Sequence, residues 1–119
     1  MNNSKKARKA YKKAQKAYNK AFKGINVKEN EAIVLKCKTS LCYDFALNIP
    51  GADIKAHEKV ILDLKDLFYC FHFAYSIPEA NIEEHFKVIL NSGDKYWLED
   101  FIEKVNYKDT KVEEWVMHI

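Results

Sequence analysis

Apolar residues recur along this chain at the three- and four-residue spacing of amphipathic helices, in short blocks separated by Pro, Gly, Asn and Asp. The first block, residues 4–23, is followed by Gly24, a residue type common just after a helix. The pattern predicts a helix here that packs on the rest of the chain by one apolar stripe. The stripe consists of Ala7, Tyr11, Ala14, Tyr18 and Ala21, flanked by Ala10, Ala17 and Phe22.

The next feature is an internal repeat. Residues 42–69 and 70–97 are identical at 13 of 28 aligned positions. Residues 24–35 match residues 51–62 more weakly, at an offset of 27. A repeat of this length is typical of stacked supersecondary units. We therefore expect the helix over residues 4–23 to fill the first-helix position of an earlier, divergent unit.

Each clear copy predicts two short helices. The first covers residues 40–49 and 67–77 and ends before Pro50 and Pro78, because the residue before a proline avoids the helical region. These first helices carry their apolar side on Cys42, Phe45, Ala46 and Ile49, and on Cys70, Phe73, Ala74 and Ile77. The second helices have predicted cores of Ile54, Val60, Ile61 and Leu64, then Ile82, Phe86, Ile89 and Leu90.

Short polar residues mark where the helices begin. Asn26, Asp53, Asn81 and Asp109 recur at steps of 27, 28 and 28, and are predicted to cap the second helices through their side chains. Asp66 and Asp94 are predicted to cap first helices in the same way. The last unit keeps Phe101, Ile102, Val105, Asp109, Val116 and Met117 at register but lacks the proline.

These elements predict an all-α fold, a short α-solenoid-like stack of about four helical pairs with a basic N-terminal helix. We expect one helical-repeat domain over residues 1–119. Residues 1–38 form the basic helix and the divergent first repeat, 39–66 and 67–94 are the clear repeats, and 95–119 is a degenerate terminal repeat. Terminal repeats diverge because one of their faces meets water.

The net charge of +3 conceals a strong asymmetry. Residues 1–23 hold nine basic side chains and no acidic one, whereas the rest of the chain has 11 basic and 17 acidic residues. Either the acidic body offsets these charges within the molecule, or an external polyanion such as nucleic acid or an acidic protein surface does so. The candidate partner- or nucleic-acid-binding residues are Lys5, Lys6, Arg8, Lys9, Lys12, Lys13, Lys16 and Lys20.

Composition also indicates the cellular environment of the protein. No apolar run approaches the ~20 residues of a membrane span, and the basic N-terminus lacks the apolar segment of a signal peptide. Cys37, Cys42 and Cys70 are odd in number and lack CxxC spacing, which favours a reduced, cytoplasmic setting. The apolar stripe of the basic helix is Ala and Tyr rather than Leu and Trp, so we expect no membrane partner.

Candidate catalytic residues are few. His57 and His85 are repeat-equivalent and lie beside core positions, where a structural role is the simpler interpretation. Cys42 and Cys70 lie on apolar faces as small hydrophobes, and Cys37 has only Lys36 and Lys38 nearby to support reactivity. No phosphate loop, nucleophile elbow or zinc-protease motif is present. We expect no enzyme activity, no catalytic residue, no cofactor and no metal.

The block FALNIPGADIKAHEKVIL (residues 45–62), with NSGDKYW (residues 91–97) before the next unit, resembles tandem 28-residue helical repeats of uncharacterised bacterial and phage proteins. The resemblance covers residues 42–97 well and 98–119 loosely, and it reaches residues 1–23 only by position. It implies an α-solenoid encoded by a phage or mobile element. Small proteins of that origin often act by occupying host machinery, including defence nucleases.

Together these features predict a non-catalytic binding module that docks on, and inhibits, a host protein or nucleoprotein, in an anti-defence role of the anti-CRISPR type. The alternative is direct nucleic-acid binding through the Lys-rich helix. A small enzyme that uses Cys37 or the histidines is a third and weaker hypothesis.

Overall fold

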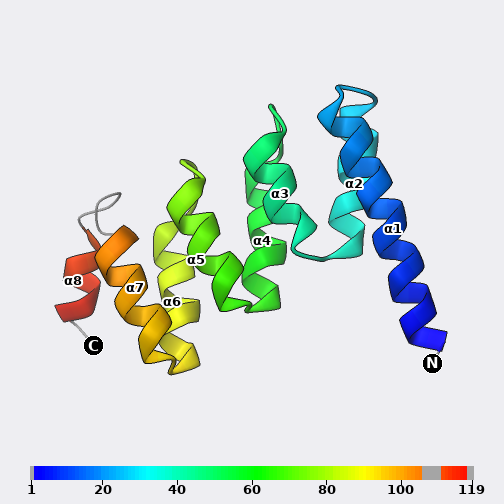
Figure 1. Cartoon of the computed structure of the whole chain (residues 1–119). Coiled ribbons are helices and arrows are strands. Elements are labelled where there is room, and N and C mark those ends of the chain that lie inside the picture. Colours follow the sequence, from blue (N-terminus) through cyan, green and yellow to red (C-terminus); the bar gives the residue numbers. More distant parts are fainter. Residues whose placement is uncertain (1, 106–110, 118–119) are drawn as a thin grey trace. The chain divides into compact units, whose positions relative to one another are not determined.

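A computed structural model describes residues 2–105 and 111–117, and this part of the chain forms eight helices and no strand (Figure 1). The predicted all-α class is therefore confirmed. The helices are α1 (Asn2–Phe22), α2 (Val27–Cys37), α3 (Leu41–Asn48), α4 (Ile54–Leu64), α5 (Leu67–Ser76), α6 (Ile82–Ser92), α7 (Lys95–Val105) and α8 (Lys111–Met117). None of these helices is long and apolar enough to cross a membrane. The predicted cap at Asp109 lies outside the described residues.

The helices group into two compact units, residues 1–64 and 65–119. In the first unit α1 packs on α2 and α3, α2 packs on α3 and α4, and α3 packs on α4. In the second unit α5 packs on α6 and α7, α6 packs on α7, and α7 packs on α8. Consecutive helices therefore pair as predicted, and in the first unit the second pair packs on the first.

A proline turn ends the first helix of each clear repeat. In the first copy the amide of Ala52 donates to the carbonyl of Ile49 at 3.2 Å. Gly51 lies inside this turn with a φ of +77°, as the third position of a type II turn requires. The second copy has Glu79 in place of Gly51, and no left-handed residue occurs there. The repeat thus keeps the position of the turn while its type changes.

Side-chain caps begin α4, α5, α6 and α7 at the predicted positions. In the described residues, backbone amides donate to Asp53 from Ala56, to Asp66 from Phe68 and Tyr69, to Asn81 from Glu84, and to Asp94 from Trp97. The prediction is wrong at Asn26, which has a left-handed φ of 41° and makes no side-chain cap bond. A left-handed backbone does not aim the Asn26 side chain at the first turn as the usual extended N-cap does.

The predicted core positions of the repeats are buried or half-buried in the described residues, except for two that are exposed. Phe45, Phe73 and Phe101 are its largest fully buried side chains. The predicted core positions Leu64 and Met117 are instead 43% and 84% exposed. Both are the last residues of their helices, so their side chains extend past the end of the packed interior.

The apolar stripe of α1 is buried only in its C-terminal half. Ala14, Ala17 and Ala21 are buried, whereas Ala7, Ala10, Tyr11 and Phe22 are exposed. Helix α1 has 21 residues and α2 has 11, so the N-terminal part of α1 runs past the end of its neighbour (Figure 1). The prediction that the whole stripe packs on the chain is therefore wrong for its first half.

Candidate binding site on helix α1

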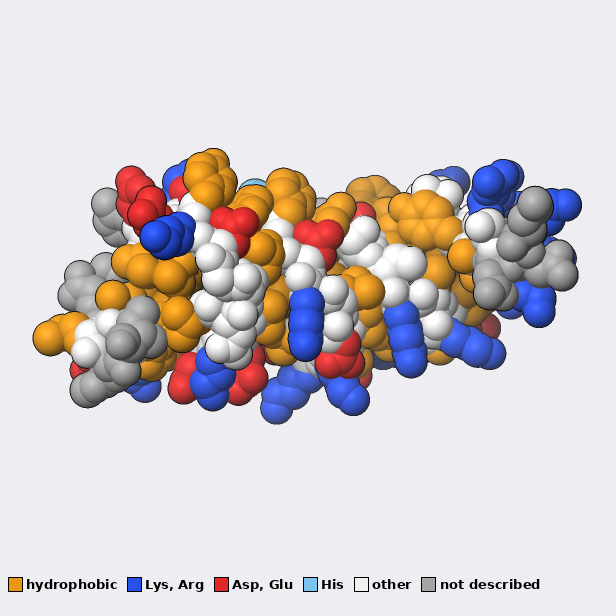
Figure 2. Space-filling view, turned by 90° about the horizontal axis from the view of Figure 1, so that it is seen from below, with side chains coloured by type: hydrophobic (Ala, Val, Ile, Leu, Met, Phe, Trp, Pro, Cys, Tyr) orange, Lys and Arg blue, Asp and Glu red, His pale blue; other side chains and the backbone are white. Residues whose placement is uncertain are grey.

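The basic residues of α1 lie on one exposed face. At about 100° per residue, those between residues 5 and 20 fall within an arc of roughly 160°, opposite the buried Ala14. All eight predicted binding residues are exposed, namely Lys5, Lys6, Arg8, Lys9, Lys12, Lys13, Lys16 and Lys20. In Figure 2, Lys and Arg side chains gather at the end of the first unit that carries the N-terminus. We call this set of eight residues the basic face.

The basic face has no acidic partner in the part of the chain that the structure describes. None of its eight side chains forms an ion pair there. The acidic residue Glu31 in the same unit pairs instead with Lys28 and His57. Direct contacts within the described residues therefore do not neutralise the basic face, which leaves its charge available to a partner.

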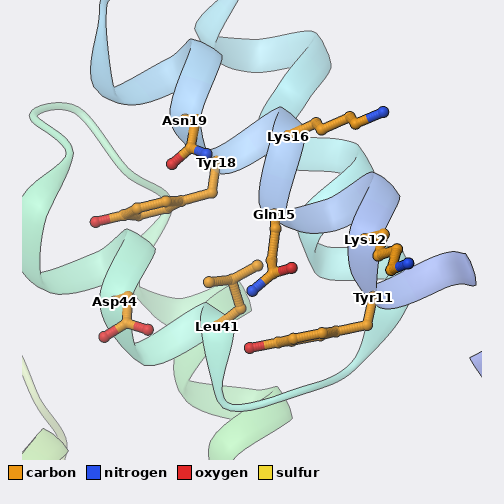
Figure 3. Close-up of a pocket in the computed structure, with 8 residues that line it drawn as sticks. All are labelled: Tyr11, Lys12, Gln15, Lys16, Tyr18, Asn19, Leu41 and Asp44. Atoms are coloured by element: carbon orange, nitrogen blue, oxygen red, sulfur yellow. The ribbon is translucent and has the colours of Figure 1, made fainter. Parts of the chain in front are cut away.

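A hollow of about 480 Å³ lies between α1 and α3, beside the basic face (Figure 3). Its lining residues are Tyr11, Lys12, Gln15, Lys16, Tyr18, Asn19, Leu41 and Asp44. The rings of Tyr11 and Tyr18 project from α1 on the same side, and Gln15 and Leu41 lie between them (Figure 3). We call this the tyrosine hollow.

The two tyrosines differ in how the protein holds them. Tyr18 is half-buried, its hydroxyl oxygen accepts a hydrogen bond from Nδ2 of Asn48 at 3.0 Å, and its ring meets the edge of Phe45 at 6.3 Å between centroids. Tyr11 is 37% exposed and has no hydrogen-bond or ring partner among the described residues. A hydrogen bond and a ring contact hold Tyr18, whereas neither kind of interaction holds Tyr11 among the described residues.

The other end of the hollow is acidic. Asp44 of α3 is half-buried, and this burial raises the pKa of its carboxyl above the usual value. In Figure 3 its carboxylate lies on the side to which the tyrosine hydroxyls point, and the amines of Lys12 and Lys16 lie on the opposite side. The hollow therefore offers two aromatic rings, an acceptor at one end and cations at the other.

A smaller hollow of about 270 Å³ lies between α1 and α2. It is lined by Ala10, Lys13, Ile33, Lys36 and Cys37. Cys37 is half-buried and not in a disulfide. Its thiol borders an apolar surface between two lysines, but no second catalytic group lines this hollow.

Glu31 and His57 form a buried pair that joins the two helical pairs of the first unit. Oε2 of Glu31 accepts hydrogen bonds from Nε2 of His57 at 2.9 Å and from the backbone amide of Asp53 at 2.7 Å. Lys28 lies 3.5 Å from Oε1 of Glu31 and also donates to the carbonyl of Gly51. The carboxylate of α2 thus holds the start of α4 in place.

The ring of His57 is enclosed. It stacks on Phe45 at 4.8 Å, and the equivalent His85 stacks on Phe73 at 5.2 Å in the second unit. Both histidines are fully buried. Burial lowers the pKa of His57, although the hydrogen bond that His57 donates to Glu31 opposes this change. A neutral, enclosed imidazole that already bonds a carboxylate is poorly placed to exchange protons with a substrate.

The buried thiols are equally inaccessible. Cys42 and Cys70 are fully buried, and burial raises the pKa of each thiol to about 12. In the described residues no cluster of three or more His, Cys, Asp or Glu side chains could hold a metal ion.

Sequence reasoning missed an aromatic surface on α5 and α7 of the second unit. Phe68, Tyr75 and Tyr96 are 48%, 50% and 70% exposed, and Trp97 is half-buried. Phe68 meets the edge of Trp97 at 6.2 Å, and Tyr75 stacks on the buried Phe71. The dense aromatic run over residues 68–75 was the available signal, but periodicity alone assigned these residues to a helix and its core.

Comparison with protein-family models, with curated proteins and with solved structures gives no match for this chain.

Proposed function

We propose that the chain is a non-catalytic helical-repeat binding module whose basic face docks on an anionic protein or nucleoprotein partner. The observation that carries this proposal is a run of eight basic side chains on one side of α1 without an ion pair among the described residues. Like charges on one helix face destabilise it, and an anionic partner relieves that cost. The aromatic surface of α5 and α7 supports the same class of function, because exposed Tyr and Trp are typical anchors of protein interfaces.

The proposal includes an α-solenoid stack and an inhibitory role against a host protein, of the anti-defence type expected of a phage or mobile-element product. Packing of α3 and α4 on α1 and α2 supports the stack within the first unit. The burial of His57, Cys42 and Cys70 supports a non-catalytic role, because substrates have no access to these groups.

The second candidate is direct nucleic-acid binding through the same helix. The tyrosine hollow favours it, because aromatic rings beside lysines are the usual means of holding single strands.

The test is charge reversal. A variant with Lys9, Lys13, Lys16 and Lys20 changed to Glu is expected to keep its helical content and unfolding midpoint, because exposed substitutions cost little. It should lose the partners that wild type captures from a bacterial lysate. The matched control reverses four exposed lysines outside α1, which gives the same change in net charge: Lys55, Lys59, Lys65 and Lys95.

Capture is repeated with and without nuclease. Partners retained after nuclease treatment support a protein surface, and partners lost support nucleic acid. If the reversed variant captures every partner as well as wild type does, the basic face is not the docking site and the proposal fails.

A further inference from the structure

We propose that the tyrosine hollow holds an unpaired base of a single-stranded nucleic acid, with the adjoining phosphates along Lys12 and Lys16. This inference rests on the proposed docking through α1 and names the part of the partner that the hollow contacts. It assigns a ligand to Tyr11, whose ring has no partner among the described residues.

Two aromatic rings line the hollow and can hold a flat group. Tyr11 and Tyr18 lie seven residues apart on α1, which places them about 10 Å apart along the helix axis, on the same side. Tyr18 is held by Asn48 and Phe45, so it is a fixed wall, and Tyr11 is the exposed ring on which an incoming flat group can stack. Every base has a π-face, and stacking on aromatic rings is the main sequence-tolerant contact of single strands.

Polar and charged side chains also line the hollow, and they match the groups of a nucleotide. Gln15 and Asn19 bring amides to the hollow, which match the carbonyl and N–H groups on a base edge. Asp44 adds an acceptor for an N–H group on the base edge, such as N3–H of thymine. The amines of Lys12 and Lys16 lie on the other side of the hollow from Asp44, where a phosphate is attracted and not repelled (Figure 3).

The same arrangement disfavours the other anionic partners inside the hollow. The carboxylate of an acidic peptide would enter beside the carboxylate of Asp44, at an electrostatic cost. Paired bases of a duplex are stacked on one another and cannot enter without leaving the helix. The volume of the hollow, about 480 Å³, lies within the range of small-molecule sites. A hollow of this size accommodates a single nucleotide.

The experiment measures the affinity of the full chain for three probes at one salt concentration. The probes are a short oligothymidylate, an abasic strand with the same number of phosphates, and a blunt duplex of the same length. The variants are Tyr11→Ala, Tyr11→Phe and, as a control, Ile25→Ala, which removes an exposed apolar side chain that lines neither the hollow nor the aromatic surface. Circular dichroism checks that each variant is folded.

Wild type should bind the oligothymidylate more tightly than the abasic strand and the duplex. Tyr11→Ala should weaken binding of the oligothymidylate by roughly 5- to 150-fold, the range for one stacked base, and leave the abasic strand unchanged. Tyr11→Phe and Ile25→Ala should behave like wild type, because the first keeps a ring in the hollow and the second does not line it.

Equal affinity for the oligothymidylate and the abasic strand, with no effect of Tyr11→Ala, overturns the inference. In that case a loss of binding in the lysine-reversed variant would still uphold docking through the basic face. Absence of any binding to the oligothymidylate also overturns the inference, and the lysate experiment then decides the proposed function separately.

Discussion

Glu31 shows how much one buried side chain contributes in this fold. Its carboxylate accepts from the fully buried Nε2 of His57 and from the amide of Asp53, which is only partly buried. A buried donor left without an acceptor costs the full desolvation of that group. The residue is therefore a junction between helical pairs, and its charge is compensated locally by Lys28.

Replacing Glu31 with Ala is expected to lower the free energy of unfolding by about 2 kcal/mol or more, because the buried N–H of His57 and the partly buried amide of Asp53 lose their acceptor. Denaturant unfolding measures the change. Glu29→Ala is the matched control, since Glu29 is an exposed carboxylate on the same helix and its removal should cost within about 0.5 kcal/mol. Equal costs for the two variants would show that the Glu31 pair does not stabilise the unit.

The stability of the chain should also depend on the protonation of His57. Burial lowers its pKa below the ordinary value of 6.5, so at falling pH the unfolded chain binds a proton before the folded chain does. Stability from this group is present above the unfolded pKa and is lost as pH falls below it. The groups that face His57 are Glu31 and Asp53, which favour its protonation but do not outweigh the burial.

Unfolding measured across mildly acidic pH checks this sign. Free energies of unfolding should decrease below about pH 6.5 in wild type, and the decrease should be smaller in His57→Gln. His72, whose pKa burial also lowers, contributes in the same direction, and His72→Gln is the comparison variant. A wild-type stability that rises as pH falls through this range would contradict the assignment of His57 as a buried neutral group.

At the scale of the helix, left-handed residues recur at the ends of the second helices. Lys38, Lys65 and Gly93 follow α2, α4 and α6 with φ of 53°, 54° and 77°. Only glycine adopts this conformation without a Cβ clash, so the two lysines carry a cost that the third repeat avoids. The position of the helix end is kept across the repeats while the residue type varies.

Lys38→Gly should accordingly raise the free energy of unfolding by about 1 kcal/mol, and Gly93→Ala should lower it by about the same amount. A Cβ at Gly93 would meet nothing within 4 Å, so the cost there is that of the backbone alone. Denaturant unfolding of both variants measures the two changes in the free energy of unfolding. If both substitutions change the free energy of unfolding in the same direction, the left-handed backbone does not determine the stability of these helix ends.

At the scale of the whole molecule, charge is concentrated on one helix while the acidic residues lie elsewhere in the chain. Such a distribution makes association sensitive to salt, because each lysine that meets a phosphate releases a counterion. The number of contacts can therefore be read from the salt dependence of binding.

Affinity for duplex DNA through the basic face should fall by about 0.9 log unit per log unit of salt for each phosphate contacted. A protein partner that is recognised by shape as well as charge should show a shallower slope. Titrations over a range of salt concentrations distinguish the two, and the lysine-reversed variant should show a slope near zero. A steep slope that survives the reversal would place the phosphate contacts outside α1.

Much of the architecture was predictable from the sequence because its signals are local. Periodicity, proline and the capping residues Asp53, Asp66, Asn81 and Asp94 act within one helical turn, so they located the helix ends without knowledge of packing. Where a local rule failed, as at Asn26, the backbone adopted a left-handed conformation that no short pattern in this chain indicated.

Sequence by itself determined the helical pairs, their repeat and the basic face, since each depends on residues close together in the chain. Only the tertiary structure decided which half of the α1 stripe is buried, because that depends on the length of α2 beside it. It also brought Glu31 to His57, 26 residues apart, and Asp44 to Tyr11 and Tyr18. Residues distant in the sequence come close together because of how helices pack, and the periodicity of a single helix carries no information about its neighbours.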